Sequence, residues 1–392
     1  MPSSPITTLF SATYVQARQK FLAACTLAGV APQTHAHPLA GAHGEALATD
    51  VARIGPADAR RVLVLTSGVH GVELFAGSGC QIDWLLTQDP AALPADTAVV
   101  VVHAINPWGS SWLRRYTEDN VDLCRNFVDY PNMPQLPPAP DYAPLHAAIA
   151  LDPQDVPAVA AADAQLAAFE QARGHQALYG ALMGGQYVWA QGMGFGGVQP
   201  TWSRRTIEQI LRQHGASARD VCLVDYHTGL GPYGYGSLVA LQQGEALQRM
   251  RRAFGGWVEA VFEHGAPENF APVYGHSTPG YERALPDACV TAAVLEFGTG
   301  RPQRMLELLV RDQREWASGR GRDRLLSSRS PDRPKNDCTP PGGLAKPGLG
   351  ALSTRQELLQ FFYPADAGWQ RSLVDQSRQV IARALRFLDD GP

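Results

Sequence analysis

The sequence lacks four features that would each place it in a special class of protein. No apolar run reaches the roughly 18 residues that a membrane-spanning helix needs, and no basic patch followed by an apolar stretch opens the chain. The formal net charge of −4 is too small to favour a nucleic acid or a membrane surface as partner. The six cysteines are scattered without a CxxC pair, so we expect reduced thiols. These absences predict a cytoplasmic protein that binds neither nucleic acid nor membrane.

The sequence does contain enough apolar residues to fill a large core. Hydrophobic residues make up 45% of the 392 positions and charged residues 18%, which excludes global disorder. Apolar segments rich in valine and leucine alternate with helical segments, as in proteins whose strands are covered on both faces. The expected strands cover 61–66, 98–103, 221–226 and 290–297, and the expected helices cover 11–30, 73–87, 201–214, 244–264, 302–317 and 354–388. The pattern predicts a layered α/β fold with a largely parallel or mixed sheet.

Two segments interrupt this alternation. Residues 130–157 are rich in Pro, Ala and Asp, and begin an expected insertion that ends near residue 200. Residues 318–350 are rich in Arg, Pro and Gly, which is typical of a long surface loop or arm. We therefore predict one α/β domain over 1–392, with the insertion 130–200 at the rim of its functional site.

Side chains that can bind a metal follow two of the expected strands. In the segment 68–73 (GVHGVE), His70 and Glu73 are three positions apart and can share one face of a starting helix. His227 follows the third strand in a glycine-containing loop. Two histidines and one carboxylate with an open fourth position are the usual ligands of catalytic zinc in hydrolases. Taken singly, each has an ordinary alternative: a solvated histidine, a glutamate favoured by the helix dipole, or a histidine bonded to the backbone.

One glutamate and three arginines are further candidates for catalysis and substrate binding. Glu296 ends the fourth expected strand, and burying an unpaired carboxylate there would be costly. Glu296 is therefore either a general base beside a metal-bound water or the partner of an arginine in an ion pair. Arg114, Arg115 and Arg125 follow the second strand. Guanidinium groups bind carboxylates and polarise carbonyl oxygens, although such a run of charge is usually a solvated surface.

The order of these motifs resembles the zinc carboxypeptidases of the carboxypeptidase A type. A His-x-x-Glu, an Asn-Pro-x-Gly, a Val-Asp-Leu-x-Arg-Asn-Phe, a lone His after a strand and a Glu after a later strand follow one another over roughly 60–300. The phrases SGVHGVELFAGSG, HAINPWG, DYHTGLGPYGYG and LEFGTG are similar to a bacterial branch catalogued as a domain of unknown function. That branch is similar also to the aspartoacylase-like deacylases. The resemblance implies a three-layer α/β/α fold of the phosphorylase/hydrolase-like type, with a mixed, largely parallel central sheet.

The resemblance also implies one zinc ion per chain and a role for each matching residue. His70, Glu73 and His227 would bind the zinc, and Asp122 would orient His70. Glu296 would activate the zinc-bound water and later protonate the leaving amine. Arg115, or alternatively Arg114, would stabilise the oxyanion of the tetrahedral intermediate. Arg125, with Asn126 beside it, would bind a carboxylate of the substrate. Tyr274 or Tyr281 would cap the bound substrate.

Cys124 departs from the family pattern. The family has Asn immediately before the carboxylate-binding Arg, and a cysteine cannot supply the amide donor. The departure weakens the expectation that Arg125 recognises a free C-terminal carboxylate, and it leaves the metal chemistry untouched. Cys124 is either a small buried hydrophobe or a reactive thiol.

Three functions fit these residues. The first is a zinc metallohydrolase of the metallocarboxypeptidase kind that cleaves an amide bond of a small peptide, by zinc-activated water with Glu296 as general base. The second is an N-acyl amino acid deacylase of the aspartoacylase kind, which would use the same residues. The third is a non-catalytic metal-containing binding module, which would have no use for Glu296. The sequence leaves the choice of substrate and the oligomeric state open.

Overall fold

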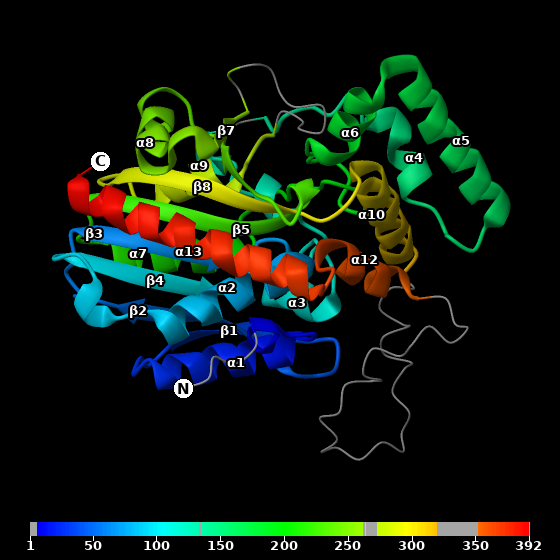
Figure 1. The fold of residues 1–392 in the computed structure, drawn as a ribbon. Helices are drawn as coiled ribbons and strands as arrows, with labels where there is room; N and C mark the ends of the chain where they lie inside the picture. Colours follow the sequence, from blue (N-terminus) through cyan, green and yellow to red (C-terminus); the bar gives the residue numbers. More distant parts are fainter. Residues whose placement is uncertain (1–5, 133–134, 262, 264–272, 320–351, 392) are drawn as a thin grey trace, which may run out of the picture.

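The computed structural model describes residues 6–132, 135–261, 263, 273–319 and 352–391 (Figure 1). One eight-stranded sheet runs through this part of the chain, in the order β1-β2-β4-β3-β5-β8-β6-β7. Its strands are β1 Gln33–Ala40, β2 Ala46–Ile54, β3 Arg61–Ser67, β4 Thr97–His103, β5 Asp220–Tyr233, β6 Gly236–Ala240, β7 Val258–Ala260 and β8 Cys289–Gly298. The central pairs β4–β3, β3–β5 and β5–β8 are parallel, whereas β1–β2, β2–β4 and β6–β8 are antiparallel.

Helices cover both faces of the sheet. They are α1 Tyr14–Leu27, α2 Leu74–Thr87, α3 Pro107–Trp112, α4 His146–Ile149, α5 Val156–Arg173, α6 His175–Met183, α7 Trp202–Gly215, α8 Gly244–Phe254, α9 Ser277–Ala284, α10 Pro302–Ala317, α12 Thr354–Phe362 and α13 Ala367–Asp390. Among the described residues, no helix combines the length and the apolar character needed to cross a membrane.

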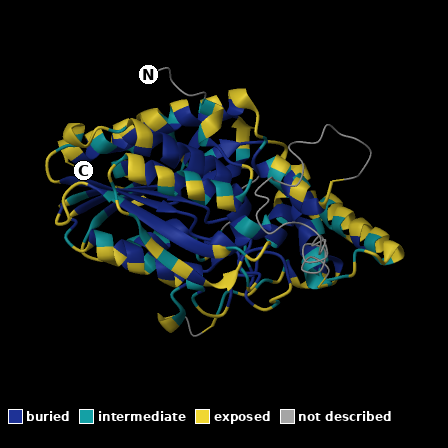
Figure 2. Ribbon diagram, turned by 90° about the horizontal axis from the view of Figure 1, so that it is seen from below, coloured by how far each residue is buried: buried dark blue, intermediate teal, exposed yellow. Residues whose placement is uncertain are grey.

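Alternation of side chains along the central strands produces the three layers. Leu63 and Leu65 pack in one core with α1, α2, α8 and α13, whereas Val62 and Val64 pack in a second core with α7 and α9. Each fully buried side chain of this kind contributes roughly 1.5–3 kcal/mol to folding. Figure 2 shows the buried sheet between helices whose outer sides are exposed. The predicted α/β/α fold with a mixed, largely parallel sheet is confirmed.

The segment 130–200 forms helices α4, α5 and α6 beside α10 (Figure 1). A third core joins α4 and α6 to α10 and α12. The predicted arm at 318–350 lies outside the described residues from 320 onward. The five cysteines that the structure describes are free thiols, as predicted.

Two helix predictions are wrong in their extent. The helix expected over 244–264 ends at Phe254, because Gly255 takes a left-handed φ of +67°, and β7 follows it. The helix expected over 354–388 is two helices, α12 and α13, separated by a segment that contains Pro364. Proline cannot donate the backbone hydrogen bond that would continue α12.

Candidate active site

The carboxyl ends of three parallel strands bring the predicted residues together. His70 lies three residues beyond β3, Glu73 immediately precedes α2, and His227 and Glu296 are register partners on β5 and β8. The crevice at this edge is where open α/β sheets bind their ligands. The loop that carries His70 is fixed by backbone hydrogen bonds, from Gly71 N to Arg115 O at 3.2 Å and from Val72 N to Arg114 O at 2.9 Å.

Two imidazoles face one carboxylate at the centre of the site. His70 Nδ1 lies 2.9 Å from Glu73 Oε1, and His227 Nδ1 lies 3.3 Å from Glu73 Oε2. The imidazole ring centroids are 4.9 Å apart, and all three side chains are buried. Glu73 Oε2 also accepts a hydrogen bond from Thr228 N at 3.1 Å. The two Nδ1 atoms therefore face the same carboxylate, one at each of its oxygens.

This donor set fits a divalent metal ion. His70 Nδ1 has no hydrogen-bond partner of suitable geometry among the described residues, and the Nε2 atoms of His70 and His227 face carboxylate oxygens at 3.4 and 3.1 Å. Burial and Arg115 lower the pKa of His70, but the charges of Glu73 and Cys124 and the interaction with the Asp122 carboxylate outweigh them and raise this pKa to about 10. The pocket thus stabilises positive charge at the imidazoles, and a cation bound to the neutral rings would supply that charge. Two imidazoles and a carboxylate are the donors that catalytic zinc uses.

Carboxylates and a guanidinium surround these donors. His70 Nε2 lies 3.4 Å from Asp122 Oδ1, the residue predicted to orient it. Arg115 Nε donates to Asp122 Oδ2 at 3.0 Å, and its Nη1 donates to Glu73 Oε1 at 3.3 Å. On the other side, His227 Nε2 lies 3.1 Å from Asp225 Oδ2. A carboxylate therefore lies next to Nε2 of each imidazole.

Glu296 lies beside this cluster with a raised pKa. Its Oε1 accepts a hydrogen bond from Leu230 N at 3.0 Å, and the side chain is half-buried. Burial and the negative charge of Glu73 raise the pKa of Glu296 to about 7. Such a value suits a group that takes and returns a proton near neutral pH.

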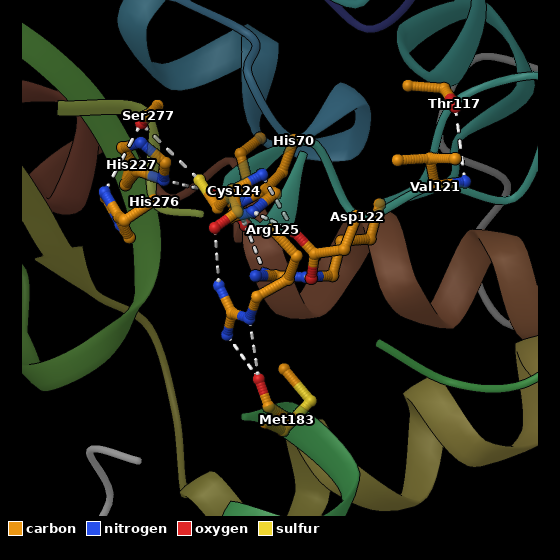
Figure 3. Close-up of polar contacts among 12 residues, drawn as sticks. His70, Thr117, Val121, Asp122, Cys124, Arg125, Met183, His227, His276 and Ser277 are labelled. Atoms are coloured by element: carbon orange, nitrogen blue, oxygen red, sulfur yellow. Dashed lines mark hydrogen bonds and ion pairs between the residues drawn. The ribbon is translucent and has the colours of Figure 1, made fainter. Parts of the chain in front are cut away.

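A cavity of about 570 Å³ opens onto these residues. Its lining includes His70, Glu73, Arg115, Cys124, Arg125, His227 and Glu296, with Tyr179 and Met183 contributed by α6. Arg125 donates through Nε and Nη2 to Met183 O and through Nη1 to Cys124 O (Figure 3). Three of its five N–H donors are therefore occupied, which leaves two for a ligand.

Cys124 lies at the same cavity (Figure 3). One donor atom each of His70, Cys124 and His227 lies within 4.8 Å of the others. The Cys124 Sγ is 3.7 Å from Ser277 Oγ. Burial raises the pKa of this thiol, but His70 and His276 together hold it well below its usual value. The thiol is buried, and its environment favours the thiolate.

Comparison with known proteins gives one family. The model of a family described as a protein of unknown function (DUF2817) matches residues 10–376. The chain belongs to the DUF2817 family. This confirms the predicted relation to a branch catalogued as a domain of unknown function. No curated protein matches the sequence.

Several solved structures are similar to this DUF2817 protein. Carboxypeptidase A from Helicoverpa armigera is 11% identical with a TM-score of 0.41, over 84% of this chain and 78% of the other. Bovine thrombin-activatable fibrinolysis inhibitor, in complex with tick carboxypeptidase inhibitor, is 10% identical with a TM-score of 0.43, over 81% and 98%. The ectoine utilization protein EutE (DoeB) from Ruegeria pomeroyi is 14% identical with a TM-score of 0.35, over 74% and 67%.

Four residues predicted at the substrate do not line the cavity of the DUF2817 protein. Arg114 is fully buried, where its Nε donates to Asp312 Oδ2 at 2.9 Å and its guanidinium lies over Trp316 at 4.2 Å. Asn126 Nδ2 donates to Gly196 O at 2.8 Å and so anchors the end of the segment 130–200. Tyr274 is 55% exposed and is not among the lining residues.

Tyr281, the other predicted capping tyrosine, is fully buried against Phe127. Sequence reasoning also missed two residues at the DUF2817 site. His276 lines the cavity, and no motif marked it. Asp225 could have been found from its position two residues before His227, because residues two apart on a strand point to the same face.

Proposed function

We propose that this protein is a zinc-dependent hydrolase that cleaves the amide bond of a small peptide. One observation supports the proposal above all others. The Nδ1 atoms of His70 and His227 both face the carboxylate of Glu73, and these three side chains line the same cavity as Glu296. A binding module would need the metal ligands but would have no use for Glu296.

The proposed reaction divides the work among the lining residues. His70, Glu73 and His227 would hold the zinc, which when bound supplies a Lewis acid and lowers the pKa of water. Glu296 takes the proton from the attacking water at its carboxylate and passes it to the leaving amine. The half-buried side chain lines the cavity, and the hydrogen bond from Leu230 N restrains its carboxylate there.

Arg115 is the arginine placed to meet charge that develops on the carbonyl oxygen. It lines the cavity, and its two bonds to Asp122 and Glu73 leave three N–H donors free. Arg114 lies outside the cavity, where its guanidinium donates to Asp312. We therefore assign the oxyanion contact to Arg115 and leave Arg114 a structural role.

Replacing Arg115 by Met is expected to lower kcat by about 100- to 1,000-fold, the usual loss when one donor to the oxyanion is removed. Steady-state kinetics on the zinc-loaded variant would measure this loss. Arg114→Lys is the matched control, because it perturbs the neighbouring arginine outside the cavity. It should lower the melting temperature while kcat of the folded protein stays near wild type. Equal losses of kcat in both variants would contradict the assignment.

The rate should depend on the protonation of Glu296. A general base works only when ionised, so kcat/KM is expected to fall as pH drops through the pKa of Glu296. That pKa is raised to about 7 in the protein, and the charge of a bound cation would lower it from there. The acid limb of the pH profile should therefore lie at or somewhat below pH 7. A profile flat down to pH 4 would exclude Glu296 as the base.

An N-acyl amino acid deacylase is the second candidate. Cys124 stands beside Arg125 without an amide donor, so a free peptide C-terminus has one anchor fewer than the carboxypeptidase pattern provides. A panel of dipeptides and N-acyl amino acids, assayed with and without a chelator, tests both. Hydrolysis of one class that is abolished by chelation and restored by zinc supports the proposal. No hydrolysis of either class by the zinc-loaded protein would count against it.

A further inference from the structure

Asp225 lies directly behind the second histidine of the site. It precedes His227 by two residues on β5, so both side chains point to the same face of the sheet. Its Oδ2 lies 3.1 Å from His227 Nε2, the ring nitrogen turned away from Glu73. Asp225 is fully buried. A buried carboxylate so close to a ring nitrogen suits an acceptor for the imidazole N–H.

Two hydroxyl groups fix the orientation of this carboxylate. Thr66, its register partner on β3, donates through Oγ1 to Asp225 Oδ1 at 2.8 Å. Ser277, the first residue of α9, donates through Oγ to Asp225 Oδ2 at 3.4 Å. Three separate elements therefore hold the Asp225 carboxylate against His227.

The charge around Asp225 differs from the charge around Asp122. Asp122 shares its negative charge with Arg115, whose Nε lies 3.0 Å from its Oδ2. In the described part of the chain, no Lys or Arg forms an ion pair with Asp225. Within the described residues, Asp225 forms its ion pair with His227, and the charge of Asp225 also acts on the neighbouring Tyr281. The His227 imidazole is therefore the group in this ion pair that can carry the compensating positive charge.

We propose that Asp225 is a positioning residue for the metal site, acting through His227. It accepts the proton of Nε2, which fixes the tautomer of the ring and leaves the Nδ1 lone pair directed at the metal beside Glu73. A carboxylate behind a ligating histidine also makes that histidine a stronger donor. The inference rests on the proposed metal site, and it names the residue that orients the second histidine.

Asp225→Asn tests the inference through metal affinity. The zinc dissociation constant, measured by competition with a chromophoric chelator, is expected to rise about 10- to 100-fold, as for other outer carboxylates of zinc sites. The melting temperature of the metal-free protein is measured alongside, because a merely structural role would lower it without changing zinc affinity. Asp50→Asn is the control for loss of a buried strand carboxylate: Asp50 pairs with Arg18 at 2.6 Å and accepts from Thr34 Oγ1 at 2.7 Å. It should leave zinc affinity unchanged.

Equal zinc affinity in wild type and Asp225→Asn would overturn the inference and leave the proposed function standing. Absence of zinc binding by the wild type would overturn both. If Asp225→Asn does not fold, NMR of the zinc-loaded wild type decides instead. A slowly exchanging, low-field proton on His227 Nε2 is the expected result, because the bond to Asp225 shields it from water. Rapid exchange of that proton would overturn the inference.

Discussion

Glu296→Gln is expected to lower turnover by about 100- to 10,000-fold while one zinc ion stays bound, since general bases commonly contribute that much. The amide of Gln is almost the size of the carboxylate, but it cannot accept the proton of the attacking water. None of the atoms proposed to hold zinc belongs to Glu296, so the metal should remain. Single-turnover kinetics with a substrate from the active class, together with metal analysis of the same sample, would measure both quantities.

Glu259→Gln is the matched control for this experiment. Glu259 also lines the cavity, but its Oε1 accepts from Ser237 Oγ at 2.7 Å, and it forms no ion pair with the candidate metal ligands among the described residues. The control should keep turnover within a few-fold of wild type, because the proposed mechanism assigns Glu259 no proton transfer. Near-normal turnover in Glu296→Gln would show that another group acts as the base. Loss of zinc from Glu296→Gln would show that Glu296 is a metal ligand instead.

The central part of the fold could be predicted because its sequence signal is strong. Strands β3, β4, β5 and β8 are buried on both faces, so each is a short continuous run of apolar residues. Strands β1, β2, β6 and β7 were not predicted. Strand β1 is mostly exposed and β7 has only three residues, so neither shows such a run. Strand β1 joins the sheet by pairing with β2, and β7 joins it by pairing with β6. The hydrophobic pattern of their own residues does not reveal these pairings.

The candidate site residues that could be predicted from sequence are those that follow a buried strand. His70, Glu73, His227 and Glu296 all lie at the one cavity, and Asp122 lies behind His70 as predicted. The arginines could not be ranked from sequence. Arg114 and Arg115 are neighbours along the chain, and only tertiary packing shows that one pairs with Asp312 and the other lines the cavity.

Residues that reach the site from distant segments left no local signal. His276 reaches the cavity because α9 begins beside Asp225 of β5, a contact made by packing between segments far apart in sequence. The environment of Cys124 has the same origin, since His276 and Ser277 approach it from α9. The sequence therefore pointed to the candidate metal ligands but not to the residues that surround them.

The central claim is that His70, Glu73 and His227 bind one zinc ion. The measurement that tests it most directly is elemental analysis of the purified wild type and of His70→Ala after both are supplied with zinc. His103→Ala is the matched control, because His103 is a buried histidine at the end of the neighbouring strand β4 that contacts Ser78 Oγ at 2.9 Å. We predict about one zinc per chain in wild type and in His103→Ala, and little or none in His70→Ala. A wild type without metal, or a His70→Ala that retains it, would contradict the claim.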